Sequence, residues 1–284
     1  MITLSPATLA GLGAILLWGL LALLTAATEG VPPFLLTALT FAIGGGLGLA
    51  LIAMRGDLGK LRQPAMAWAL GVGGLFGYHA VYFAALKTAP PAEASLIAYL
   101  WPLLIVLFSG LLPGEKLTFR HVLGAVLGFA GVVALALSKG GIGSGTAFPV
   151  LGYSLALACA FLWAGYSVLS RRMASVPTEA VVGFCLATAA LAGLAHLALE
   201  PRGLPQEPAT WGAILALGLG PVGAAFFLWD IGMKRGDIRF LGTAAYAAPV
   251  ISTLALILAG RAEAGWPLAI ACALIVGGAV IARR

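Results

Sequence analysis

Ten apolar stretches, each about as long as a helix that crosses a lipid bilayer, constrain this chain more than any other feature. Because a helix rises 1.5 Å per residue, about 20 residues span the ~30 Å of hydrocarbon. The stretches are too long and too uniformly apolar to be strands of a membrane barrel. We therefore predict an all-α integral membrane protein whose transmembrane helices cover residues 8–27, 33–54, 65–86, 91–112, 119–138, 149–170, 179–199, 210–233, 238–260 and 266–282.

Composition excludes a soluble fold and a nucleic-acid partner. Hydrophobic residues make up 61% of the chain and charged residues only 9%, which is too little charge for a surface in water. The net charge of +6 comes from basic residues scattered at the ends of the apolar stretches rather than gathered in one patch. Cys159, Cys185 and Cys272 lie inside apolar stretches without a metal-binding spacing. We expect no metal and no cofactor.

The distribution of Lys and Arg predicts how the helices are oriented. If the N-terminus is inside, the inner loops and the C-terminus hold 12 of these residues and the outer loops hold 4. Cytoplasmic loops of membrane proteins carry the excess of Lys and Arg. We therefore expect both termini to lie in the cytoplasm. The four residues assigned to outer loops are Lys87, Lys139, Arg202 and Arg261.

The chain repeats its pattern after about 147 residues. Each half contains five predicted spans, and an odd number makes the second half start on the opposite side of the membrane. We therefore predict two inverted five-helix repeats, residues 1–143 and 144–284, with a ligand site near the midplane between them. The pairs that share an offset of 147 are Tyr82 and Trp229, Lys87 and Lys234, Tyr99 and Tyr246, and Pro102 and Pro249; Trp18 and Trp163 differ by 145, and Glu115 and Glu263 by 148.

The helix that begins near Tyr78 carries three candidate ligand contacts on one side. Tyr78, His79 and Tyr82 fall within about 100° of a helical wheel. The two tyrosines either line a cavity or pack between helices. For His79, three roles remain open: contact with a substrate, a neutral imidazole bonded to a neighbouring helix, or a proton carrier. An ionisable side chain at this depth is unfavourable in lipid and is expected to face the bundle interior.

Prolines inside two equivalent spans predict broken helices. Tyr99 and Trp101 are two residues apart, or roughly 200° on an ideal helix, so both face one cavity only if the helix is deformed. Pro102 supplies a cause, because it leaves the carbonyl of Ala98 without its usual donor. The candidate substrate-binding residues are Trp18, Tyr78, His79, Tyr82, Tyr99, Trp101, Trp163, Trp229 and Tyr246, and the candidate helix breakers are Pro102 and Pro249.

One residue breaks the symmetry of the two halves. Trp101 has Ala248 as its counterpart, which allows a site that binds a substrate through one half only.

Acidic residues are rare within the spans. Glu93 and Asp230 lie near span ends, where they are either solvated or paired with Lys87 and Lys234, respectively. Ion coupling therefore has little support.

Two further groups of residues have structural interpretations. His121 and His196 also lie at span ends, where we expect them to be solvated or at the membrane interface. The motif Gly124-x-x-x-Gly128 is expected to pack helices inside one molecule, and a monomer is expected.

The layout of the chain resembles a known family of transporters. Ten spans in two halves, Trp18-Gly19, Pro-Ala-Glu-Ala-Ser from Pro91, Tyr-Leu-Trp-Pro from Tyr99 and Gly-Glu-Lys from Gly114 resemble the EamA-type families of the drug/metabolite transporter superfamily, over nearly the whole chain. The aromatic residues around Tyr78 and Trp101 look most like those of bacterial aromatic amino-acid exporters. The resemblance implies a secondary transporter in the cytoplasmic (inner) membrane of a bacterium, which exports aromatic and other apolar amino acids by alternating access.

Other functions have less support. Export of other small metabolites or drugs remains open. Carriers of nucleotide sugars or organic phosphates need fixed Lys or Arg in the cavity, and the spans have none near their middle. An enzyme is not expected, because the sequence contains no HExxH, GxSxG or P-loop motif. A purely structural subunit would have no need of two halves that meet at a midplane site.

Overall fold

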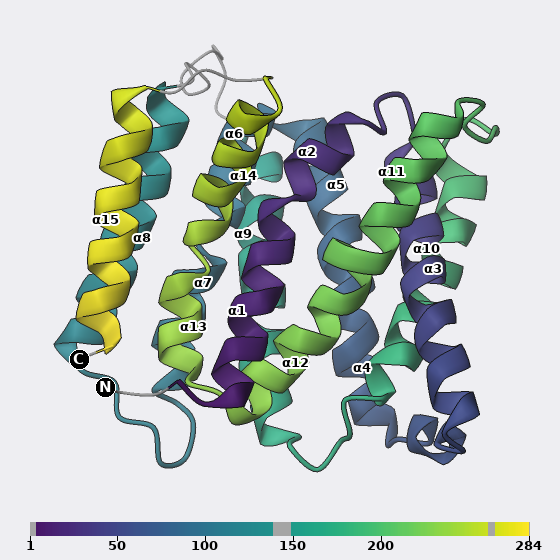
Figure 1. The fold of residues 1–284 in the computed structure, drawn as a ribbon, viewed down its shortest axis with the longest axis horizontal. Helices are drawn as coiled ribbons and strands as arrows, with labels where there is room; N and C mark the ends of the chain where they lie inside the picture. The colour runs from purple at the N-terminus through teal and green to yellow at the C-terminus, as the bar shows by residue number, and fades with distance from the viewer. Residues whose placement is uncertain (1–3, 139–148, 261–264, 284) are drawn as a thin grey trace.

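The structure is a computed structural model that describes residues 4–138, 149–260 and 265–283. These residues form helices and connecting turns, without a strand (Figure 1). The helices are α1 (Pro6–Gly19), α2 (Leu21–Ala26), α3 (Pro33–Met54), α4 (Ala65–Val72), α5 (Tyr78–Thr88), α6 (Pro91–Ala98), α7 (Trp101–Ser109), α8 (Phe119–Ser138), α9 (Val150–Arg172), α10 (Ala180–Leu199), α11 (Pro208–Leu219), α12 (Ala225–Arg235), α13 (Ile238–Ala244), α14 (Ala247–Leu258) and α15 (Trp266–Arg283).

These helices make up the ten predicted spans. Each observed span begins and ends within three residues of its predicted limits. Within the described ranges, seven helical segments are long and apolar enough by themselves to cross a bilayer, and three shorter apolar helices supply the remaining spans. The prediction of ten transmembrane helices is therefore confirmed. Glu263, Lys139, Arg261, Arg284 and the repeat boundary at residues 143 and 144 lie outside the described residues.

Five spans are interrupted rather than continuous. The first bends at Leu20, between α1 and α2. The fourth and ninth break between α6 and α7 and between α13 and α14, just before Pro102 and Pro249, as the prolines predict. The third and eighth contain π-helical turns, at Gly73–Gly77 and Gly220–Ala224. The two π-helical turns begin 147 residues apart, so both kinds of interruption obey the internal repeat.

The two repeats pack against each other as an inverted pair. Equivalent spans face one another, since α3 packs against α10, α8 against α15 and α7 against α13. The remaining contacts come in matched sets: α1 packs on α12, just as its equivalent α9 packs on α5. Both ends of the described chain lie at the same end of the bundle, at the bottom of Figure 1. This is the arrangement that two five-span repeats of opposite orientation produce.

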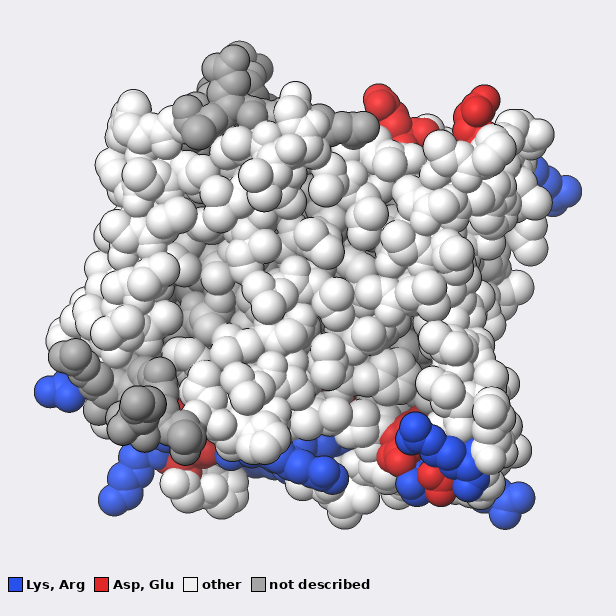
Figure 2. Space-filling view, in the orientation of Figure 1, with Lys and Arg blue, Asp and Glu red and all other residues white. Residues whose placement is uncertain are grey.

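The surface has the charge distribution of a membrane protein. The middle of the face shown in Figure 2 is free of charged side chains, and most of the Lys and Arg lie along the end that holds the termini. Large apolar side chains are exposed instead, as Leu16, Phe161 and Leu258 illustrate. At the terminal end, Lys60 bonds to Asp57 and to Glu179, which joins the first repeat to the second. The hydrogen bond to Glu179 raises the pKa of Lys60, and the same bond lowers the pKa of Glu179.

Glycines let α8 and α15 approach within backbone contact. A Cβ atom on Gly124 would lie 2.4 Å from the carbonyl oxygen of Gly278, and a Cβ on Gly278 would lie 2.4 Å from that of Gly124. Gly128 accommodates the ring of Tyr246. The GxxxG motif therefore packs helices inside one molecule, as predicted.

We expect Gly278→Ala to destabilise the protein, because the new methyl group meets backbone atoms that cannot rotate away. Overpacking of this kind costs about 1–3 kcal/mol. The matched control is Gly277→Ala, since a Cβ on Gly277 meets nothing within 4 Å. Melting of the two purified variants should show a lower midpoint for Gly278→Ala only. Equal midpoints would contradict close packing of α8 on α15.

Candidate functional site

A cavity of ≈ 870 Å³ lies between the two repeats. It reaches from Trp18, at the end of α1, to Thr28, Glu29 and Gly30 in the connection between α2 and α3. That connection lies at the end of the bundle opposite the termini (Figure 1), so the cavity opens at that end. Seven of the nine candidate substrate-binding residues line it: Trp18, Tyr78, His79, Tyr82, Tyr99, Trp101 and Trp163.

Tryptophans from both repeats meet at the bottom of the cavity. The rings of Trp18 and Trp163, which correspond in the repeat, are 5.7 Å apart, and Trp101 lies 6.3 Å from each. Phe226 contacts both Trp18 and Trp163 at 6.1 and 5.7 Å. Most of these pairs meet edge to face, the geometry that the ring quadrupoles favour. We call Trp18, Trp101, Trp163 and Phe226 the aromatic floor.

Trp229 and Tyr246 do not lie on the cavity wall, in contrast to the prediction. Both side chains are fully buried. Trp229 lies beneath the floor, 5.0 Å from Trp18, and its indole N–H donates to Ser167 at 3.0 Å. Tyr246 lies behind the broken helix of the other repeat, where its hydroxyl accepts from the backbone N–H of Leu103 at 3.0 Å. The repeat preserves their aromatic character, but both side chains serve helix packing.

The break before Pro102 lets two neighbouring residues face one cavity. Tyr99 and Trp101 both line it, although their spacing on a regular helix would separate them. The helix ends at Ala98 and begins again at Trp101, which turns both side chains inward. Their counterparts Tyr246 and Ala248 differ, because Tyr246 is directed away and Ala248 lines the wall with only a methyl group. The wall contributed by α14 therefore leaves space that the opposite wall fills with an indole.

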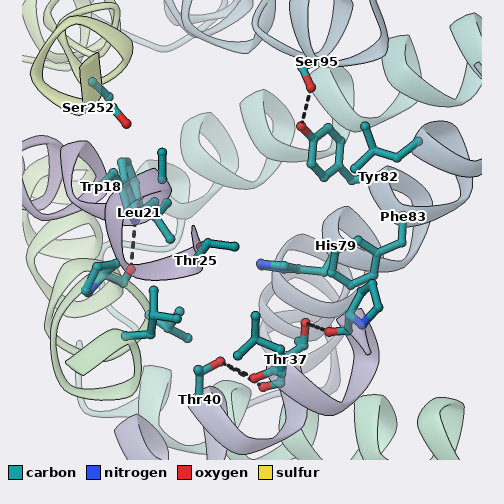
Figure 3. Close-up of a pocket in the computed structure, with 18 of the residues that line it drawn as sticks. Trp18, Leu21, Thr25, Thr37, Thr40, His79, Tyr82, Phe83, Ser95 and Ser252 are labelled. Carbon is teal, nitrogen blue, oxygen red and sulfur yellow. Dashed lines mark hydrogen bonds between the residues drawn. The ribbon is translucent and has the colours of Figure 1, made fainter. Parts of the chain in front are cut away.

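One polar wall faces the cavity from α3 and α5. The Nδ1 atom of His79 lies 2.7 Å from the carbonyl oxygen of Leu75, one turn earlier. Thr37 and Thr40 donate their hydroxyl hydrogens to the carbonyls of Pro33 and Leu36, both at 2.8 Å (Figure 3).

A second polar group completes this side of the cavity. The hydroxyl groups of Tyr82 and Ser95 bond to each other at 2.8 Å, which links α5 to α6. Each hydroxyl has one hydrogen, so one of the two remains available to a ligand.

The π-helical turns hold this wall and the floor in place. Leu75 belongs to the first turn, and its carbonyl orients His79. Pro221 belongs to the second turn, and its carbonyl accepts from the indole N–H of Trp18 at 3.0 Å. Sequence reasoning missed these turns. A glycine-rich cluster at the same offset in both halves, with Pro221 in mid-span, was the available signal.

The polar side chains of the cavity were also missed. Thr and Ser residues in a span are easily taken for packing residues, because their hydroxyl groups can donate hydrogen bonds to backbone carbonyls of their own helix. The spacing of Thr37 and Thr40 at i and i+3 was the available signal. The residues concerned are Thr25, Thr28, Thr37, Thr40, Ser95, Ser252 and Thr253.

The end of the bundle that holds the termini is closed below the floor. Glu115 bonds to Arg171 at 2.9 Å and contacts Arg239 at 3.4 Å. Arg171 also donates to the carbonyls of Met233 and Gly236 at 3.0 and 2.8 Å. These bonds connect the loop after α7 to α9, α12 and α13. We call Glu115, Arg171 and Arg239 the terminal-end ion cluster.

Ionisable groups at the span ends are paired in ways that only partly match expectation. Asp230 and Lys234 bond at 2.8 Å and are both buried, as the pairing alternative predicted. Glu93 instead accepts from the hydroxyl of Tyr153.

The prediction for His196 is wrong. The residue is buried, and its ring bonds to Glu200 at 3.0 Å. The carboxylate of Glu200 accepts from the backbone N–H groups of Phe34 and Leu35 at 2.8 and 3.1 Å, so it caps α3. The carboxylate of Glu200 is held inside the protein by the start of α3, and the bond to this carboxylate keeps the ring of His196 buried.

Ten spans in inverted repeats, broken at equivalent positions around a central cavity, define a secondary transporter. Comparison with known proteins agrees. The profile of the EamA-like transporter family matches residues 5–137 and again residues 150–284, so the chain belongs to this family, which is part of the drug/metabolite transporter superfamily.

Several individual proteins are similar along nearly the whole chain. The protein named aromatic amino acid exporter YddG from Ancylobacter novellus is 61% identical over 98% of this chain and 97% of its own. The protein of that name from Salmonella typhimurium is 30% identical over 88% of this chain and 87% of its own. A solved crystal structure with 60% identity covers 99% of this chain and 97% of its own, with a TM-score of 0.94.

The different surroundings of two equivalent tyrosines lead to a prediction. Tyr246→Phe removes the acceptor of the Leu103 N–H, and an unsatisfied buried donor costs about 1–3 kcal/mol. Tyr99→Phe, its counterpart in the repeat, alters the cavity wall instead. We expect Tyr246→Phe to lower the melting midpoint with little change in substrate preference, and Tyr99→Phe to do the reverse. A stable Tyr246→Phe variant with altered preference would contradict the packing role.

Proposed function

We propose that this protein exports aromatic and other apolar amino acids from the bacterial cytoplasm by alternating access. The observation that carries the proposal is the aromatic floor, which combines four rings of both repeats at the bottom of the cavity. A flat apolar side chain gains about 0.5–1.5 kcal/mol from each favourable ring contact, beyond the burial of its area. The names of two full-length relatives support the same substrate class.

The polar wall matches the other end of such a substrate. His79 and the Tyr82–Ser95 pair lie one helical turn apart on the same side of the cavity, next to the floor. An amino acid carries an ammonium group and a carboxylate on one carbon. We infer that the ammonium group meets His79 and Thr37, and that the carboxylate takes the hydrogen left on the Tyr82–Ser95 pair.

We infer that the end with the termini is cytoplasmic, because most of the Lys and Arg lie there. The cavity then opens to the outside, and the terminal-end ion cluster closes it to the cytoplasm. Residues 1–143 and 144–284 act as the two repeats. One chain forms the whole cavity, so the proposal requires only a monomer.

We infer that His79 contacts the substrate and does not carry a coupling proton. Proton relays in transporters usually link several Asp, Glu or His residues. Of the acidic residues described, only Glu29 lines the cavity, at its mouth and far along the chain from His79. A cell that overproduces an amino acid supplies an outward gradient by itself, which suits a facilitative exporter.

Nucleotide sugars and organic phosphates fit less well. Recognition of a phosphate needs Lys or Arg, or several backbone N–H groups at a helix N-terminus. The described residues that line the cavity include neither Lys nor Arg. Export of other small metabolites remains the alternative.

Selectivity of the floor is testable by Trp101→Ala in proteoliposomes. We expect counterflow of tryptophan and phenylalanine to fall more than that of threonine, because only the aromatic substrates lose a ring contact. Trp211→Ala is the control, since Trp211 lies on α11, is partly exposed and does not line the cavity. An equal loss for all three substrates would indicate a defect in folding or gating, and no counterflow by the unaltered protein would refute the proposed function.

Orientation is testable by a reporter fused after Arg284. A reporter that is active only in the cytoplasm should be active, and one that is active only in the periplasm should be silent. The opposite result would place the open end of the cavity toward the cytoplasm.

A further inference from the structure

The hydrogen bond that orients His79 also determines what its ring offers to a ligand. A carbonyl oxygen can only accept, so Nδ1 must carry the hydrogen in the bond to Leu75. In a neutral imidazole, the other nitrogen is then an acceptor. Figure 3 shows the tip of this ring directed into the cavity.

The neighbouring hydroxyls on this wall are acceptors too. Each hydroxyl has one hydrogen, and those of Thr37 and Thr40 are already donated to carbonyls of α3. These two hydroxyl oxygens therefore offer only lone pairs to the cavity. His79, Thr37 and Thr40 therefore form a patch that can accept hydrogen bonds and cannot donate them, which we call the acceptor wall.

The charges of the cavity favour the same kind of ligand. Of the described lining residues, Glu29 is the one with a formal charge, and that charge is negative. Among the residues that the structure describes, no guanidinium or ammonium group lines the cavity to neutralise a carboxylate. Next to the acceptor wall, His79 and Phe226 both contact the ring of Phe41, at 5.3 Å each. Aromatic faces attract cations as well as other rings.

We propose that the protein also binds and transports aromatic primary amines, that is, aromatic compounds with an ammonium group and no carboxylate. The inference rests on the proposed function, because it uses the same cavity. An ammonium group has three donors, which the acceptor wall can receive. The carboxylate of an amino acid meets hydroxyl groups but, among the described lining residues, no Lys or Arg that would bind it by charge, so its loss weakens binding little. Loss of the ammonium group removes every bond to the acceptor wall and leaves a net negative ligand.

Three compounds with the same indole ring test this proposal on the full-length protein. L-tryptophan has both groups, tryptamine lacks the carboxylate, and indole-3-propionate lacks the ammonium group. Each competes with labelled L-tryptophan for the purified protein at pH 7.5. We expect tryptamine to compete within about tenfold of L-tryptophan, and indole-3-propionate to be at least about tenfold weaker than tryptamine, a difference of about 1.4 kcal/mol. Equal competition by the two, or the reverse order, would overturn the proposal.

Transport requires a second measurement. Proteoliposomes loaded with labelled L-tryptophan should release it faster when tryptamine is supplied outside. The reason is that the transporter can then return to its inward-facing state with tryptamine bound and take up the next labelled molecule. Competition without faster release would make tryptamine an inhibitor and would overturn transport of amines. If L-tryptophan does not bind at all, the proposed function fails, and binding of labelled tryptamine then tests the present inference by itself.

Variants separate the acceptor wall from general damage. His79→Phe keeps a ring without an acceptor, and Thr37→Val keeps the shape without the oxygen. Both should weaken tryptamine by about tenfold or more and leave indole-3-propionate nearly unchanged, while His79→Gln, which restores an acceptor, should recover most of the tryptamine binding. Thr88→Val is the matched control, since Thr88 also bonds to its own helix but lies outside the cavity. Equal losses of all three ligands in folded Thr37→Val would overturn the role of the wall.

Discussion

A polar backbone group inside a bilayer needs a partner within the protein, and the broken spans of this fold depend on that constraint. The break before Pro102 leaves the N–H of Leu103 without its helical acceptor, and the hydroxyl of Tyr246 supplies one from the other repeat. The carbonyl of Pro221 in the eighth span likewise receives the indole N–H of Trp18 from the first. Each repeat therefore satisfies a defect in the other, so that the interruptions exist only where the two halves meet.

The same interruptions create the cavity. Regular helices would separate Tyr99 from Trp101. In a regular helix the carbonyl of Leu75 would accept the backbone N–H of His79, whereas in this structure it bonds to the ring of His79. Packing of complete helices against one another would also fill the midplane. Because the spans depart from regular helical geometry at equivalent positions, side chains of both repeats converge around one cavity. Trp18 meets Trp163 at the bottom of this cavity.

Sequence reasoning predicted the spans well, since a bilayer imposes one length and one composition on every helix. The repeat, the inverted architecture and the proline breaks followed from residue identities at constant offsets. The packing of Trp229 and Tyr246 between helices, away from the cavity, could not be predicted in that way. An offset relates positions in two repeats, but α6 and α7 face the cavity with Tyr99 while α13 and α14 direct Tyr246 into the packing between helices. The burial of His196 depended on Glu200 capping a helix of the other repeat, a contact 165 residues distant along the chain that no local pattern contains.

The inverted repeat makes the two ends of the bundle equivalent in backbone but not in chemistry. Arg171 and Arg239 close the terminal end through Glu115, and residues 147 positions earlier are Leu24 and Ala92, which have no charge. When the opposite end closes, it therefore cannot use the same ion pairs at the equivalent positions.

Alternating access needs two states of comparable free energy. Here the state with the terminal end closed contains ion pairs between the repeats, and these must break when the terminal end opens. A substrate that binds between the repeats adds contacts to both at once. The aromatic floor is built from both repeats, so a ligand on it is placed where its binding energy can offset the loss of those ion pairs.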